Sequence, residues 1–146
     1  MSLESLRKVR ARAQEAVMME LALLTQELTR MERQCETIEA QIQAEASDYQ
    51  AQVERGLAVE AMWEWQGRLD SRRASLGKTH AAIQNLMKAW NAAQERLIEA
   101  TQERKVLDRL AERRQRARDV EILRREQYAT DEAAGRVWGA SEKRSS

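Results

Sequence analysis

A seven-residue repeat of apolar side chains runs through the middle of the sequence and constrains the fold more than any other feature. Its first row consists of Met62, Leu69, Leu76, Ile83, Trp90 and Leu97. A second row, three residues behind the first, contains Trp65, Leu86, Ala93, Ala100 and Leu107, with Arg72 and Thr79 as polar interruptions. Two such rows form a narrow apolar seam on an α-helix, and a seam of this kind must be covered by another helix.

An earlier stretch of the chain carries a matching stripe. Its apolar members step by four and three: Val17, Leu21, Leu24, Leu28, Met31, Cys35, Ile38 and Ile42. Glu45 interrupts the stripe before Tyr49 and Val53 resume it. Gly56 follows directly and is the best candidate for a break, because glycine is favoured just past a helix end. A short link between two long amphipathic helices makes them antiparallel neighbours, so the two seams can cover each other within one chain.

The composition agrees with one elongated all-α domain. The 146 residues include no proline, no phenylalanine and five glycines, and 34% of them are charged. Such a chain cannot build an ordinary globular core but is too apolar for a disordered one. We predict a long antiparallel two-helix coiled coil over 1–140, with helices at about 3–54 and 61–138, a turn at about 55–60 and a frayed tail at 140–146.

Charge favours pairing between the two different helices over a homodimer of like helices. Residues 13–60 contain ten acidic residues against three basic ones, whereas residues 61–125 contain fifteen basic against nine acidic ones. Charges that flank a heptad seam select the partner helix and its orientation. Because the arms are unequal, Leu3 is expected opposite roughly Ala111, so the chain beyond Glu112 has no internal partner. That arm could also pair between chains, and the oligomeric state stays open.

No enzyme or cofactor site is predicted. The sequence offers no glycine-rich phosphate loop and no nucleophile with a nearby histidine, and a two-helix rod encloses no pocket. Cys35 is expected as a small buried hydrophobe and the single histidine, His80, as a solvated flank residue. Basic residues near both ends could bind nucleic acid, but acidic residues are interleaved with them and the net charge is only +1. A solvated ion-pair face or a docking surface for an acidic protein is the better interpretation.

The N-terminus begins with charged residues and no apolar run approaches the length of a membrane span, so we expect a cytosolic chain. Trp63 and Trp65 are two residues apart and cannot both face the seam. One of them is therefore expected to be exposed beside the turn, where it could anchor a partner protein.

The layout resembles the flagellar export protein FliJ family over nearly the whole chain. The resemblance is carried by the Arg/Glu-rich stretch at 102–114 and the acidic cluster at 131–134 with Arg136 after it. The short segments Asp48-Tyr49-Gln50 and Trp65-Gln66 also resemble that family. It implies a coiled-coil hairpin that hydrolyses nothing itself and couples the hexameric export ATPase to the export gate. It also implies that the protein helps to deliver chaperone–substrate complexes, and that it lies in the cytoplasm at the inner face of the membrane, at the flagellar base.

By analogy with such stalks, two sets of partner contacts are expected. The contacts with the cytoplasmic domain of the gate protein are Gln41, Tyr49, Trp63, Trp65 and Leu69. The contacts with the ATPase ring are Arg7, Arg10, Arg104, Arg109, Arg113 and Arg114. Export chaperones are further expected partners, whereas nucleic acid, small molecules and cofactors are not. The alternatives are a stalk protein of a virulence-type secretion system, a structural coiled coil unrelated to secretion, and, below these, a basic rod associated with nucleic acid.

Overall fold

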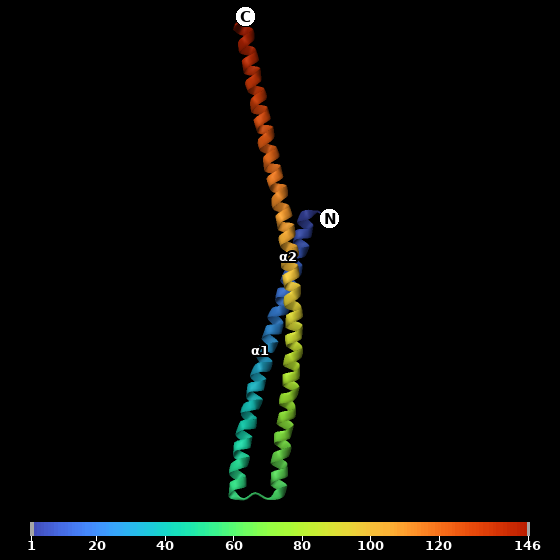
Figure 1. Ribbon diagram of the computed structural model, residues 1–146, viewed down its shortest axis with the longest axis vertical. Helices are drawn as coiled ribbons and strands as arrows, with labels where there is room; N and C mark the ends of the chain where they lie inside the picture. The colour runs from blue at the N-terminus through green and yellow to red at the C-terminus, as the bar shows by residue number, and fades with distance from the viewer. Residues whose placement is uncertain (1, 146) are drawn as a thin grey trace. The chain divides into compact units, whose positions relative to one another are not determined.

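Two long α-helices make up the chain in the computed structural model, which describes residues 2–145 and their side chains through residue 142 (Figure 1). α1 spans Leu3–Arg55 and α2 spans Val59–Ser145. No strand occurs among the described residues. The prediction of an all-α chain with two long helices packed against each other as a coiled-coil hairpin is confirmed.

The helix ends follow from local sequence. Ser2 caps α1, because its hydroxyl oxygen accepts a hydrogen bond from the Ser5 amide at 3.2 Å. α2 continues to Ser145, although the sequence predicted an end at about 138 and a frayed tail from 140. Gly135 and Gly139 weaken the helix without ending it, since a single glycine costs only about 1 kcal/mol and no proline follows. Ser146 lies outside the described residues.

The connection between the helices depends on one glycine. Gly56 has a φ of 94°, a left-handed conformation that residues with a side chain rarely adopt. Its amide donates a hydrogen bond to the Val53 carbonyl oxygen at 3.1 Å, which satisfies one of the free acceptors at the end of α1. The helical ladder of α2 begins where the Met62 amide donates to the carbonyl oxygen of Ala58. Residues 56–58 are therefore enough to reverse the chain.

The helices contribute to two compact units, which are described separately. The hairpin unit is Arg12–Ala100, and the arm unit combines Met1–Ala11 with Thr101–Ser146. Within the hairpin unit α1 and α2 lie side by side (Figure 1). The predicted seam residues of this unit are all buried or half-buried. The most buried positions are Leu21, Cys35, Ile38, Leu69, Thr79 and Ala93.

Cross-helix contacts in the hairpin unit follow one antiparallel register. Oppositely charged or aromatic side chains meet from the tip to the middle of the unit. The contacts join Tyr49 to Trp65, Glu45 to Arg72, Thr25 to Trp90 and Glu20 to Arg96. The acidic partner comes from α1 and the basic partner from α2, as the charge asymmetry of the two segments predicts. Hydrogen bonds from Arg96 lower the pKa of Glu20.

The two polar interruptions of the seams face each other. The Arg72 guanidinium donates to a Glu45 carboxylate oxygen and to the Gln41 side-chain oxygen, both at 2.7 Å. The second Glu45 oxygen is buried without a hydrogen-bond partner in the described structure. A charged pair inside an apolar seam adds little net stability, but any shift in register would separate its members. This polar layer therefore selects the observed register.

The arm unit contains the first turns of α1, which pack against α2. Two ion pairs join the segments, and here α1 supplies the basic residue and α2 the acidic one. They are Arg7 with Asp108 at 3.1 Å and Arg10 with Glu103 at 2.6 Å. Leu107 is half-buried in this contact. Every residue at 112–138 is exposed, because no part of α1 covers this stretch of α2.

Replacing Arg72 with leucine should destabilise the protein by about 1–3 kcal/mol, since it leaves the Glu45 carboxylate without the ion pair that the described structure gives it. The double change Glu45→Leu and Arg72→Leu should restore or exceed the wild-type stability, because apolar side chains then fill both seams. Urea unfolding followed by circular dichroism measures both variants. A double variant less stable than Arg72→Leu alone would contradict this account of the polar layer.

A disulfide can test the register directly. The Cys35 sulfur lies 3.9 Å from His80 Nδ1 on the other helix, so His80→Cys should form an intrachain disulfide on mild oxidation, seen as a faster-migrating monomer without reductant. Met87→Cys is the matched control, because it occupies the same heptad position one repeat further along. If the intrachain disulfide with Cys35 forms as fast in Met87→Cys as in His80→Cys, or if cross-linking occurs mainly between chains, the register is wrong.

Candidate partner-docking surfaces

The tip of the hairpin unit presents one exposed tryptophan beside an ordered one. Trp63 is 67% exposed. Trp65 packs at a tilted angle on Tyr49, with ring centroids 6.2 Å apart, and the Arg68 guanidinium carbon lies 4.5 Å from the Trp65 ring centroid. Aromatic and cation–π contacts of this kind fix Trp65 in place. Of these two tryptophans, Trp63 is thus the one that the fold leaves exposed.

The other residues expected to contact the gate differ in accessibility. Gln41 is exposed, although its side-chain oxygen accepts a hydrogen bond from Arg72. Tyr49 is half-buried against Trp65. Leu69 is only 6% exposed, because it lies between the two helices. A protein that docks on the closed hairpin can reach Trp63 and Gln41 directly, but it cannot reach Leu69.

Ion pairs divide the basic residues of the arm unit into two groups. Arg7 and Arg10 were expected to add positive charge to this region, but Asp108 and Glu103 pair with them. Arg104 is exposed and interacts with neighbouring groups. This division was not predicted from the sequence, because recognising the ion-pair partners requires the register of the two helices.

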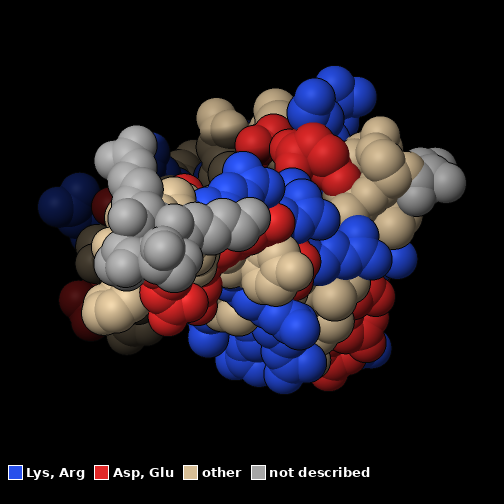
Figure 2. Space-filling model, turned by 90° about the horizontal axis from the view of Figure 1, so that it is seen from above, with Lys and Arg blue, Asp and Glu red and all other residues tan. Residues whose placement is uncertain are grey.

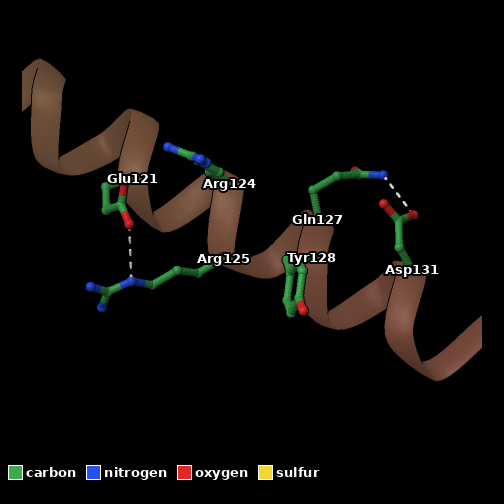
Figure 3. Close-up of a pocket in the computed structure, with 6 residues that line it drawn as sticks. All are labelled: Glu121, Arg124, Arg125, Gln127, Tyr128 and Asp131. Carbon is green, nitrogen blue, oxygen red and sulfur yellow. Dashed lines mark hydrogen bonds and ion pairs between the residues drawn. The ribbon is translucent and has the colours of Figure 1, made fainter.

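The second group consists of basic residues on the uncovered part of α2 and next to it. Arg109, Arg113 and Arg114 are exposed, and their guanidinium groups make no ion pair with any side chain that the structure describes. Further along α2, Glu121 pairs with Arg125, and Gln127 donates a hydrogen bond to Asp131 (Figure 3). Both of these interactions join residues four apart within α2. Arg109, Arg113 and Arg114 are therefore exposed cations that are available to a partner.

Basic and acidic side chains are interspersed over the face that Figure 2 presents. The pairs along α2 have the same character, since Arg116 lies near Glu112 and Arg136 near Glu132, four residues apart in each case. A surface for nucleic acid concentrates one sign of charge along the phosphate backbone. The mixed pattern suits a protein partner better.

The surroundings of Cys35 and His80 contain no assembled reactive site. Cys35 is buried, and burial between the helices raises the pKa of its thiol, with Glu39 and Glu32 adding to the effect. His80 is exposed, and its Nε2 lies 3.9 Å from a Glu39 oxygen. The described residues include no group of three or more side chains that could hold a metal ion. A buried thiol with a raised pKa is a poor nucleophile.

One apolar surface was not predicted from the sequence. Met18, Met19 and Leu23 are exposed on α1 in the hairpin unit, with Leu23 beside a shallow groove that Leu86 of α2 also lines. The spacing of four between Met19 and Leu23 places them on one helix face, next to the seam. This spacing was visible in the sequence but was masked by the stronger heptad beside it.

A comparison with protein-family models identifies the family of the chain. No helix in the described part of the chain is long and apolar enough to cross a membrane. No curated protein and no solved structure matches the chain. The family model described as "Flagellar FliJ protein" matches residues 1–143 of the 146. The match takes in both helices, the turn and the uncovered part of α2, and the chain therefore belongs to the FliJ family.

Proposed function

We propose that this protein couples a hexameric export ATPase to the export gate, with the hairpin unit contacting the gate and the arm unit contacting the ATPase ring. Membership of the FliJ family makes the chain a component of flagellar-type protein export. The finer role rests on the two docking surfaces described above. Neither surface offers a catalytic group, so the proposed role is to transmit contact between partners while the ATPase hydrolyses the nucleotide.

Trp63 is the observation that supports the gate contact most strongly. An exposed tryptophan on a rigid element supplies a large apolar area at a small cost in conformational entropy, as interface hot spots do. The tilted contact between Trp65 and Tyr49 joins α1 to α2 at the tip that carries Trp63. In this proposal Gln41 adds a polar contact at the rim. Leu69 contributes indirectly, by holding the helices together beneath the docking surface.

The arm unit suits an oxygen-rich, acidic partner surface such as one lining the ATPase ring. Arg109, Arg113 and Arg114 carry guanidinium groups with no ion pair among the described side chains, and Arg104 lies just before them on α2. Exposed cations of this kind speed up association and fix orientation more than they raise affinity. In the proposal Arg7 and Arg10 act by holding α1 against α2 through their ion pairs.

Two further parts of the proposal rest on the family. Export chaperones are additional partners, and this protein helps to deliver their complexes with substrates to the gate. The protein acts in the cytoplasm, at the inner face of the membrane, through its contact with the gate. The family description, which names the flagellum, favours the flagellar system over a virulence-type one. Loss of motility on deletion of the gene, with virulence secretion intact, distinguishes the two systems.

Replacing Trp63 with alanine should weaken binding of the cytoplasmic domain of the gate protein by about 30-fold or more, the size of a hot-spot loss. Isothermal titration calorimetry with the purified domain measures the change. Tyr49→Ala should weaken binding less, because it removes the Tyr49–Trp65 contact between the helices but leaves Trp63 in place.

Trp138→Ala is the matched control for this experiment, since Trp138 is a similarly exposed tryptophan, 72% accessible, in the arm unit. Its affinity for the gate domain should equal that of the wild type. If Trp63→Ala binds the gate domain as tightly as the wild type, or if Trp63→Ala and Trp138→Ala lose the same affinity, the hairpin tip does not form the gate contact.

A further inference from the structure

The apolar face of α2 changes sides within the arm unit. The half-buried seam residues of this unit, Leu107 and Ala111 among them, face α1, and Ala111 is the last of them before the exposed stretch 112–138. The same heptad positions further along are charged, as at Arg114, Arg118 and Arg125. Apolar side chains lie instead on a neighbouring face of α2, next to the face that α1 covers. Its apolar members are Val106, Leu110, Ala117, Val120, Ala134 and Trp138.

These apolar residues belong to a second heptad stripe, with alternating steps of four and three, which we call the arm stripe. Its remaining positions are polar: Arg113, Arg124, Gln127 and Asp131. Figure 3 shows Arg124 and Gln127 on one side of α2, with Glu121, Arg125 and Tyr128 on another. Val106 is 62% exposed and Val120 is 64% exposed. A heptad stripe of this kind matches the requirements for covering by another helix.

The arm stripe is complementary to itself. When two copies of the arm are aligned antiparallel about Ile122, each stripe position faces another stripe position. Val106 then faces Trp138 of the other copy, and Leu110 faces Ala134, a large side chain against a small one. Val120 faces Arg124, whose aliphatic stem can cover it while the guanidinium reaches solvent. An interface of this type is isologous, so every contact occurs twice.

The charged positions of the stripe fit the same alignment, because it places Arg113 opposite Asp131 of the other copy. Arg113 makes no ion pair with any described side chain, and Asp131 only accepts a hydrogen bond from Gln127 at 3.2 Å. Both groups are therefore available. The arrangement repeats that of the hairpin unit, where Glu45 and Arg72 meet as the polar interruptions of two facing seams.

We propose that the arm stripe is a homodimerisation surface, on which the exposed part of α2 pairs antiparallel with a second copy of this chain, centred on Ile122. The charge match of Arg113 with Asp131 and the self-complementary apolar spacing identify the second copy as the occupant. The dimer does not depend on the proposed export role, and its failure would leave gate binding by Trp63 untouched. If Arg113 also contacts the ATPase ring, dimerisation and ring binding exclude each other.

Sedimentation equilibrium of the full chain over a wide concentration range tests the proposal. The wild type should convert from a 16.9 kDa monomer to a species of twice that mass. Asp131→Arg places like charges opposite each other at two symmetric positions, so it should weaken dimerisation at least tenfold. Combining Asp131→Arg with Arg113→Asp exchanges the charges and should restore dimerisation to near the wild-type level.

Asp119→Arg is the matched control. Asp119 also accepts a hydrogen bond from the glutamine four residues before it, at 3.0 Å, but it lies outside the arm stripe. The change in charge and the loss of a local hydrogen bond are therefore the same, yet dimerisation should be unaffected. A wild type that stays monomeric at all concentrations would overturn the proposal. So would a loss in Asp119→Arg equal to that in Asp131→Arg, or a double variant that does not recover.

Discussion

The contact between the two heptad seams is the interaction on which the rest of the structure depends. Most helical stability in proteins comes from the packing of an apolar face, and the paired helices bury only a thin line of side chains. The apolar residues supply most of the stabilisation, while Glu45 and Arg72 select the register. The fixed register then determines which residues are free. It buries Leu69, orders Trp65 and leaves Trp63 exposed at the tip.

The sequence was sufficient to predict the architecture, because heptad spacing encodes both the helix and its need for a partner. Gly56 marked the turn, since a chain reversal of three residues needs a left-handed conformation that glycine adopts easily. The asymmetry of charge also predicted the cross-helix pairs, such as Glu20 with Arg96. These features depend on local spacing and overall charge, which can both be read along the chain.

Features that depend on the register or on small energy differences could not be predicted. Arg7 and Arg10 were expected as contacts with the ATPase ring, and their pairing with Asp108 and Glu103 became visible only in the structure. In the structure α2 extends to Ser145, past the predicted end at about 138, since a glycine-containing tail can remain helical at a modest cost. The docking surfaces are harder still, since exposed residues such as Trp63 carry no periodic pattern. Their assignment to partners rests on chemistry and on the family.

Coupling to the export ATPase is the central functional claim, and the hydrolysis rate of the purified hexameric ATPase tests it most directly. Adding this protein should stimulate hydrolysis, and electron microscopy of the mixture should show helical density in the pore of the ring. A variant with Arg109, Arg113 and Arg114 all changed to alanine should lose the stimulation, because these are exposed cations without ion pairs in the described structure. Unchanged hydrolysis together with an empty pore would contradict the claim.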